Sequence, residues 1–260
     1  MFRSSFALLV LTGTLLAQSP ITPAKRIKLF NGHSLDGWST WLRENKTADP
    51  NGVFSVKRGE IIVAGTEWGG IATKSAYRDY HLIVEWKWGG PAYGKRAQAA
   101  RDSGILVHAS GADGAAGGTW LESIESQIIE GGTGDLLSVA GATRPSLTVE
   151  TRLGPDKQLY WQRGGKAETR DRGRFNWYGR DVNWKDTLGY RGPQDVEKPT
   201  GQWNRQEVIC DGDHIKVILN GVVVNEALAV KPSAGRIQLQ SEGAEIHFRK
   251  VELRPLKRGR

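Results

Sequence analysis

Short segments with alternating or β-branched residues, separated by turn residues, follow one another along almost the whole chain. Eleven of them lie at 53–57, 60–64, 81–88, 103–108, 123–129, 146–151, 205–210, 213–219, 222–226, 236–241 and 245–253. Such segments predict β-strands, and no window of a dozen residues shows a convincing helical period. Because no helical segments alternate with the strands, we expect an antiparallel sandwich.

Turn residues and composition support this fold class. Asp211-Gly212 and Asn220-Gly221 each supply residues that tolerate positive φ, so 205–226 is expected to form a three-stranded meander. The 260 residues include 33 Gly and 10 Trp but one Met. This composition argues against a helical bundle and suits strands, tight turns and exposed aromatic rings.

The first 17 residues have the features of a secretory signal peptide. Arg3 precedes an uncharged apolar run at 6–16, and Ala17 offers a small residue for cleavage. The alternative is an anchored or buried N-terminal helix, although the run is too short to span a bilayer. We therefore expect a secreted or periplasmic protein with one domain at 18–260. No later apolar stretch would anchor the mature chain in a membrane.

The charge and the single cysteine exclude several classes of protein. Lys and Arg number 36 against 28 Asp and Glu, which gives a net charge of +8. The basic residues are dispersed and belong to no recognisable nucleic-acid motif, so we expect no nucleic-acid partner. One Cys excludes an internal disulfide framework and a metal site with several cysteines.

Residues 152–202 differ from the rest of the chain, because they are rich in Gly, Arg, Asp and Trp and show little alternation. Long irregular stretches are uncommon in compact domains unless they are functional. We expect a long loop over the concave face that offers Trp177, Trp184 and Tyr190 to a ligand. A disordered insert is the alternative, which the aromatic content opposes.

Alternation also places paired polar residues on the face away from the core in three strands. If these strands are neighbours, they form one polar patch of Asp102, His108, Glu125, Gln127, Gln240 and Glu242. Carboxylates and amides beside aromatic rings suit carbohydrate hydroxyl groups. The alternative is an ordinary polar outer face.

The strand at 123–129 is close to a known catalytic pattern but lacks one part of it. Glu125-x-Gln127 resembles the strand-borne Glu-x-Asp-x-Glu arrangement of retaining sandwich glucanases, and Ile129 replaces the third carboxylate. The acid and nucleophile pair of that mechanism is therefore incomplete on this strand.

Five blocks together resemble the 3-keto-disaccharide hydrolase domain family. They are LFNGHSLDGW at 29–38, RDSGILVH at 101–108, SIESQIIEGGTGD at 123–135, GQWNRQEVICDGDHIKVILNG at 201–221 and GRIQLQSEGAEIHFRKVELRPL at 235–256. The resemblance implies a concanavalin A-like jelly-roll sandwich. It also implies activity on glycosides already oxidised to a ketone at C3 of the sugar.

A ketone at C3 explains how such a glycoside can be cleaved. It acidifies the proton on C2, a base removes this proton, and the C1 substituent leaves by β-elimination, after which water addition completes a net hydrolysis. The route needs a general base and a stabiliser for the enolate oxygen. It needs no carboxylate nucleophile, which agrees with the presence of Ile129 where the glucanase pattern has its third carboxylate.

The resemblance and the alternation together give a candidate site. The candidate catalytic residues are Glu125, Glu242, His108 and Arg101. The candidate substrate-binding residues are Asp102, Gln127, Gln240, Glu130, Trp177, Trp184 and Tyr190. Other family members often carry Asn, Arg and His at the positions of Asp102, His108 and Glu242, so which residue is the base stays open. A divalent cation on Glu125, Glu242 or His108 would be an alternative stabiliser of the enolate.

The sequence is compatible with three functions. The first is an exported enzyme that cleaves 3-keto-glycosides, and the second is a non-catalytic carbohydrate-binding module on the same sandwich. The third is a conventional retaining glycosidase. The carboxylates Glu125 and Glu242 favour an enzyme, and the incomplete carboxylate set disfavours the third function.

Overall fold

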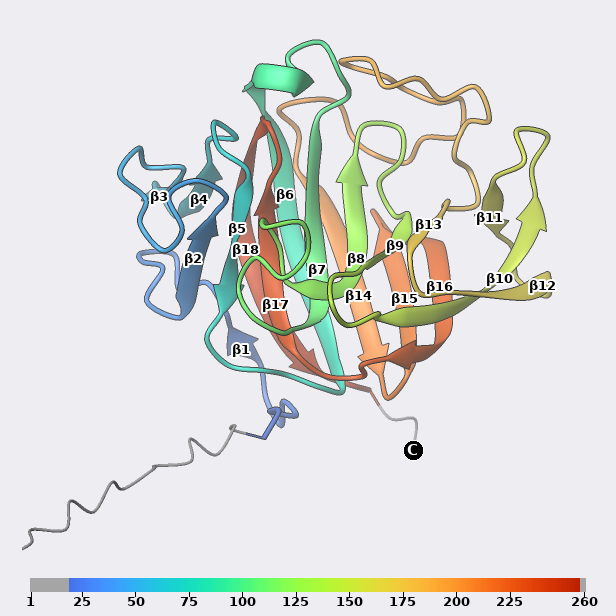
Figure 1. Ribbon diagram of the computed structural model, residues 1–260, viewed down its shortest axis with the longest axis horizontal. Helices are drawn as coiled ribbons and strands as arrows, with labels where there is room; N and C mark the ends of the chain where they lie inside the picture. Colours follow the sequence, from blue (N-terminus) through green and yellow to red (C-terminus); the bar gives the residue numbers. More distant parts are fainter. Residues whose placement is uncertain (1–18, 258–260) are drawn as a thin grey trace, which may run out of the picture.

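The computed structural model describes residues 19–257 and consists of two antiparallel sheets packed face to face (Figure 1). All eleven predicted strands are present, which confirms the all-β sandwich. The larger sheet has the order β11 (Leu159–Trp161), β10 (Ser146–Leu153), β16 (Val222–Lys231), β15 (His214–Leu219), β14 (Asn204–Asp211), β6 (Tyr80–Ala92), β18 (Ala244–Pro255), β4 (Glu60–Val63) and β3 (Phe54–Lys57). Two short strands complete it, β1 (Ile27–Lys28) on β18 and β12 (Lys166–Arg170) on β10.

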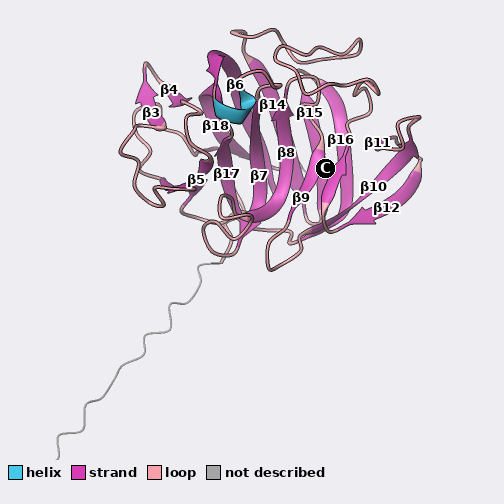
Figure 2. Cartoon of the chain, turned by 45° about the horizontal axis from the view of Figure 1, so that its top comes forward, coloured by secondary structure: helices cyan, strands magenta, loops and turns pink. Residues whose placement is uncertain are grey.

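The smaller sheet carries the polar residues of interest. Its order is β13 (Gly173–Phe175), β9 (Leu136–Val139), β8 (Glu122–Ile129), β7 (Asp102–Ser110), β17 (Arg236–Ser241), β5 (Gly69–Thr73) and β2 (Trp38–Leu42). Within residues 19–257 the one helical element is a 3₁₀ turn, η1 (Gly94–Arg96), beside these sheets (Figure 2).

The core fills the space between the two sheets. From the larger sheet, Trp86 and Trp88 pack edge to face with ring centroids 5.3 Å apart. From the smaller sheet, alternate apolar residues of β7, β8 and β17 are fully buried against them; these are Ile105, Val107, Ile124, Ile128, Ile237 and Leu239. The period of two that predicted the strands therefore also predicts which side faces the core.

The same period places the remaining residues of β7, β8 and β17 on the opposite side. These three strands are neighbours in the order β8-β7-β17, as the candidate site requires. We call this outer side of the smaller sheet the site face. It lies toward the viewer in Figure 1.

The segment 152–202 is only partly the loop that the sequence predicted. Residues 159–161, 166–170 and 173–175 are strands, so the prediction is wrong for this first part. The part from 176 to 203 holds no named strand, and it crosses the upper end of the sandwich in Figure 1. We call residues 176–203 the strap.

The predicted signal peptide, residues 1–17, lies outside the described residues. Within residues 19–257, no helix is long and apolar enough to cross a membrane.

Candidate active site

The floor of the site is a row of residues that runs across the site face. Gln127 pairs with Gly104 on β7, and Gln240 pairs with Gly70 on β5. Gln127 and Gln240 are almost fully buried. Because the two glycines carry no side chain, they leave room for the longer polar side chains of the neighbouring strands.

Gly104 is the point where two of these side chains meet. A Cβ atom at this position would overlap Oε1 of Glu125 and Oε1 of Gln240. Both oxygen atoms are buried, and neither has a hydrogen-bond partner. Burial and the nearby charge of Glu242 raise the pKa of Glu125 well above its usual range. Burial therefore favours the protonated form of Glu125.

Glu242 directly follows β17 and is partly exposed. Burial raises its pKa to about 7, and the charges of Arg96, Arg174 and Arg43 oppose that rise. A carboxyl group with a pKa near the working pH is suited to proton transfer. Glu125 is thus a buried carboxyl group and Glu242 a partly exposed one, and these different surroundings suit them to different roles in a reaction.

Three arginines surround these carboxyl groups, and each is held by a partner of its own. Arg96 forms an ion pair with Asp102 and another, of 2.8 Å, with Asp186. Arg174 lies 3.0 Å from Asp135. These arginines place positive charge around the carboxyl groups while their own positions remain fixed.

The third arginine, Arg43, belongs to an aromatic wall on the other side of the floor. Its Nε donates to Thr119 Oγ1 at 2.7 Å, and its guanidinium lies 4.8 Å from the ring centroid of Trp68. Trp68 in turn stacks on Trp120 with 5.6 Å between centroids. Sequence reasoning missed this wall, because its members come from three loops and share no strand pattern.

Asp135 supports the opposite side of the floor. It is fully buried and accepts hydrogen bonds from Arg174, Arg180 and the backbone N–H of Trp177. Arg174 also donates to Gln127 Oε1 at 3.5 Å. Asp135 therefore fixes Arg174 beside the floor, and no sequence motif marked it for this position.

The structure brings together five of the predicted site residues. Asp102, Gln127 and Gln240 lie almost fully buried on the site face with Glu125, and Glu242 lies at the end of the same strand as Gln240. Gln127 Nε2 donates to Asp102 Oδ1 at 2.5 Å. The polar residues of β7, β8 and β17 thus form one connected group.

His108 does not belong to that group, and its predicted placement is wrong. The β7 register shifts between Val107 and Ser110, and His108 has a φ of 53°. This bulge turns the side chain inward, so that its ring lies 6.1 Å from that of Tyr80 in the opposite sheet. Burial lowers the pKa of His108 to about 4, which leaves it neutral and unable to act as a cation.

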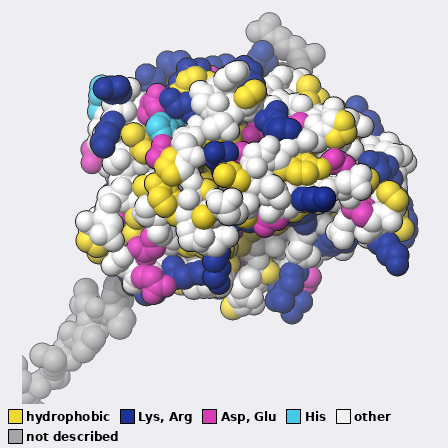
Figure 3. Space-filling view, turned by 90° about the horizontal axis from the view of Figure 1, so that it is seen from above, with side chains coloured by type: hydrophobic (Ala, Val, Ile, Leu, Met, Phe, Trp, Pro, Cys, Tyr) yellow, Lys and Arg dark blue, Asp and Glu magenta, His cyan; other side chains and the backbone are white. Residues whose placement is uncertain are grey.

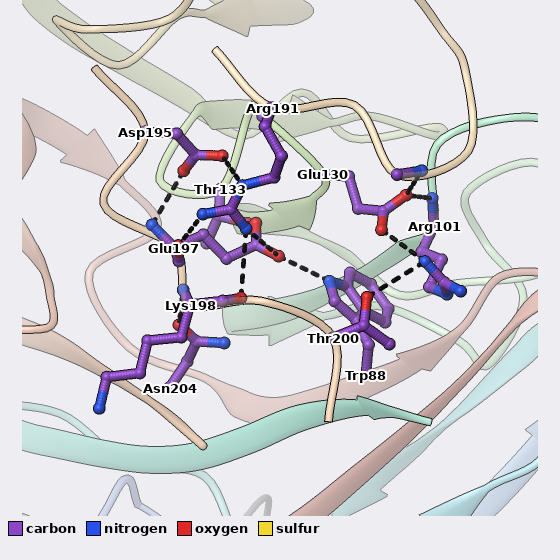
Figure 4. Close-up of polar contacts among 12 residues, drawn as sticks. Trp88, Arg101, Glu130, Thr133, Arg191, Asp195, Glu197, Lys198, Thr200 and Asn204 are labelled. Carbon is purple, nitrogen blue, oxygen red and sulfur yellow. Dashed lines mark hydrogen bonds and ion pairs between the residues drawn. The ribbon is translucent and has the colours of Figure 1, made fainter. Parts of the chain in front are cut away.

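Arg101 and Glu130 are paired with each other. Arg101 Nη1 lies 2.6 Å from Glu130 Oε1, and the Arg101 backbone N–H donates to Glu130 Oε2 at 2.9 Å. Figure 4 shows the two side chains facing one another near Thr200. Glu130 also accepts from the backbone of Gly189 in the strap. Their contacts therefore tie the strap to the sandwich.

The three predicted aromatic residues of the strap have different surroundings. Trp177 is 1% exposed within the core, so its predicted place on the ligand surface is wrong. Trp184 and Tyr190 contact each other, with 6.2 Å between ring centroids, and both lie against Gly131. Trp184 also lines a cavity of about 220 Å³ together with Arg174, so it borders the site.

The residues around Glu125 and Glu242 do not fit the divalent cation that the sequence analysis gave as an alternative stabiliser of the enolate. Within residues 19–257, no group of three or more acidic, His or Cys side chains is arranged to hold a metal ion. His108 lies between the sheets, and three guanidinium groups surround Glu242. The arginines already supply the positive charge that the cation would have provided.

The site as a whole offers a protonated carboxyl group, a second carboxyl group that titrates near neutrality, amides and fixed cations. On an all-β sandwich, these groups agree with a protein that acts on carbohydrate, the class that the family below supports. The chain belongs to the 3-keto-α-glucoside-1,2-lyase-like domain family, whose model matches residues 25–254. This membership confirms the resemblance found in the sequence.

Solved structures support the fold. A candidate glycosyl hydrolase from Parabacteroides distasonis is 19% identical, with a TM-score of 0.52 over 90% of this chain and 94% of that one. A second candidate glycosyl hydrolase from the same organism is 21% identical, with a TM-score of 0.50 over 89% of this chain and 100% of that one. A search of curated proteins found no match.

Proposed function

We propose that this protein is an exported enzyme that cleaves 3-keto-glycosides, including 3-keto-disaccharides, by removing the proton on C2 and eliminating the substituent on C1. The observation that carries the proposal is Glu242, a partly exposed carboxyl group with a pKa of about 7 amid three arginines. Membership of the family supports the choice of a 3-keto substrate.

In the first step, the Glu242 carboxylate accepts the C2 proton. The electron pair of the broken C2–H bond forms a C2=C3 double bond, and the C3 oxygen becomes an enolate. Positive charge fixed in place before the reaction stabilises such an oxyanion most effectively. Arg96, Arg174 and Arg43 are positioned around Glu242 to supply it.

In the second step, the enolate reforms the C3 carbonyl, a C1=C2 double bond forms, and the C1–O bond breaks. The departing oxygen takes up a proton, so that the leaving part of the substrate is released as an alcohol. Addition of water across C1=C2 then gives the free 3-keto sugar. Asp102 and Gln127 are almost fully buried below this position, where their contacts hold Arg96 and Arg174 in place.

A retaining glycosidase fits this site less well. That mechanism needs an ionised carboxylate as nucleophile beside a protonated acid. Glu125, the residue that matches the glucanase pattern, has a pKa well above its usual range, which disfavours the ionised form that a nucleophile needs. Ile129 occupies the position of the third carboxylate and is itself buried.

A non-catalytic binding module is the second candidate, because the aromatic wall of Trp68 and Trp120 would also serve binding alone. The paired carboxyl groups with raised pKa values favour the enzyme, since perturbed titration is characteristic of catalytic sites.

One incubation separates the three functions. The protein is mixed with a disaccharide and, separately, with its 3-keto derivative, and the products are identified by mass spectrometry. Cleavage of the 3-keto compound alone supports the proposal, whereas cleavage of the unoxidised disaccharide supports a conventional glycosidase. Binding without cleavage of either compound supports a binding module.

Export is part of the proposal and rests on the features of residues 1–17. Mass spectrometry of the protein from its native host measures the N-terminus directly. A mature chain that begins after Ala17 agrees with the proposal. An intact N-terminus in the cytoplasmic fraction contradicts it.

A further inference from the structure

A cavity of about 370 Å³ opens beside Glu242, where β2, β5, β6 and β17 end or begin. Its size lies within the range of small-molecule sites. Its lining includes Arg43, Glu44, Trp68, Tyr93, Lys95 and Gly243. We call this space the side cavity. Figure 3 shows the molecule from above the view of Figure 1, with Lys and Arg side chains spread over this end.

The side cavity and the site share a boundary. Gly243, which directly follows Glu242, lines the cavity. Arg43 also lines it, and its charge is close enough to lower the pKa of Glu242. A molecule that reacts at Glu242 can therefore extend into the side cavity without leaving the protein surface.

The walls of the side cavity are held in place by contacts within the protein. Thr119 and Trp68 fix the Arg43 guanidinium, as described above, and this uses only Nε among its hydrogen-bond donors. The backbone N–H of Tyr93 donates to the carbonyl oxygen of Gly243 at 2.7 Å. At Gly243, with a φ of 82°, a Cβ atom would overlap the side chain of Arg96.

Glu67 also lines the side cavity, but its oxygen atoms are already used. Oε1 accepts from the backbone N–H groups of Glu44 and Asn45, and Oε2 accepts from Asn45 Nδ2 at 2.6 Å. Glu67 therefore shapes the loop and leaves the recognition of a ligand to its neighbours.

The remaining groups match the chemistry of a sugar ring. Arg43 and Lys95 donate hydrogen bonds, exposed Glu44 accepts them, and Tyr93 offers apolar ring surface beside Trp68, whose ring contacts Arg43 and Trp120. A pyranose presents hydroxyl groups at its edge and C–H groups on its faces, so it uses both kinds of surface. Because positive and negative side chains are both present, the cavity suits an uncharged sugar better than an ion.

We propose that the side cavity is the subsite for the second sugar of a disaccharide substrate, the one joined through C1 of the 3-keto sugar. This inference rests on the proposed function and adds the place where the leaving sugar binds. It assigns Trp68, Tyr93 and Lys95 to the recognition of that second sugar. Through these residues the protein would distinguish a sugar from a small leaving group such as methanol.

The test compares a 3-keto-disaccharide with the corresponding 3-keto methyl glycoside. In Tyr93→Ala and Lys95→Ala, KM for the disaccharide should rise by about tenfold, the size of one lost ring or polar contact. KM for the methyl glycoside should stay within about twofold, because that substrate does not reach the cavity. Trp68→Ala is a third variant, whose folding is checked separately because Trp68 also supports Arg43 and Trp120.

Trp203→Ala is the matched control. Trp203 is a partly exposed tryptophan with Lys87 and Arg249 over its ring, and both of these belong to strands of the larger sheet. Its replacement should leave KM for both substrates unchanged. An equal rise of KM for both substrates in Tyr93→Ala and Lys95→Ala, or no rise for the disaccharide, overturns the proposed subsite.

Binding without reaction separates this inference from the proposed function. Isothermal titration with the unoxidised disaccharide measures occupancy of the cavity even if no substrate is cleaved. Weaker binding of the disaccharide by Tyr93→Ala, with binding of the monosaccharide unchanged, supports the subsite independently of catalysis. Equal binding by the wild type and Tyr93→Ala contradicts it, whether or not the 3-keto compounds are cleaved.

Discussion

Glu125 Oε1 and Gln240 Oε1 converge over Gly104 from the two strands that flank it, and both atoms are buried without a partner. A buried carboxyl oxygen without a partner disfavours the charged form of the group, and burial is the largest cause of the raised pKa of Glu125. The pair leaves Glu242 as the carboxyl group that ionises near neutrality.

The contact depends on the missing side chain of Gly104, so Gly104→Ala should displace Glu125 and Gln240. We expect kcat to fall by about 100-fold, the usual effect of misplacing catalytic groups by 1 Å. Overpacking should also lower the free energy of unfolding by roughly 1–3 kcal/mol. Steady-state kinetics and chemical denaturation measure both. Gly90→Ala is the control, because a Cβ there meets no atom within 4 Å.

Replacement of the base should slow the reaction without preventing binding. Glu242→Gln keeps the shape of the side chain and removes its ability to accept a proton, so kcat should fall by roughly 10²–10⁴-fold. Glu125→Gln should also lower kcat, because the amide cannot take the place of the protonated carboxyl group. Isothermal titration with substrate should give nearly unchanged affinity for both variants. Full activity in both would show that this face is not the active site.

The pH profile should report Glu242 directly. Because a base works only when ionised, kcat/KM of the wild type should rise as the pH increases through about 7. Arg174 lowers the pKa of Glu242, so Arg174→Gln should raise it and move the profile to higher pH. Arg144→Gln, at an exposed ion pair with Asp171, should leave the profile in place. A shift of the Arg174→Gln profile to lower pH would contradict the electrostatic account.

Glu197 in the strap predicts a loss of stability as the pH rises from about 4.5 to about 8. It is buried and accepts from Trp88 Nε1 at 2.7 Å and Thr133 Oγ1 at 2.8 Å (Figure 4). Burial and the charge of Asp195 raise its pKa from 4.5 to about 8. The folded form holds a proton that the unfolded chain releases near pH 4.5, so this stabilisation is lost as the pH rises through about 8.

Each unit of that pKa difference is worth about 1.4 kcal/mol. In Glu197→Gln, the amide oxygen still accepts from Trp88 and the Thr133 hydroxyl can rotate to accept from the amide. Thermal unfolding measured from pH 5 to pH 9 should therefore show a weaker decline of Tm in the variant. The raised pKa values of Glu125 and Glu242 leave part of the decline in place. Glu168→Gln, at a partly exposed residue of β12, should behave as the wild type.

The sequence predicted the strands well, because a period of two is visible along each of them. The same period also predicted that the polar groups of β7, β8 and β17 lie together, because alternate side chains of neighbouring strands point to the same side of a sheet. The prediction failed at His108, where a bulge with positive φ inverts the alternation. It also failed at Trp177, since aromatic content alone cannot distinguish a core ring from a ligand-binding one.

Groups that depend on long-range contacts were not accessible from the sequence. Arg43 reaches the site through Thr119 and Trp68, which lie 76 and 25 positions away in the chain. Asp135 holds Arg174 across 39 positions. Neither contact leaves a pattern of spacing, because each joins loops or strands whose approach is set by the packing of the whole sheet.

The most direct test of the account is the fate of the hydrogen on C2. A 3-keto-disaccharide labelled with deuterium at C2 is cleaved in ordinary water, and the products are examined by NMR, with an incubation without enzyme to measure spontaneous exchange. Removal of this hydrogen by Glu242 predicts slower turnover of the labelled substrate and loss of deuterium from the product. Cleavage with deuterium fully retained at C2, and at the same rate as the unlabelled substrate, would contradict both the elimination and the role of Glu242.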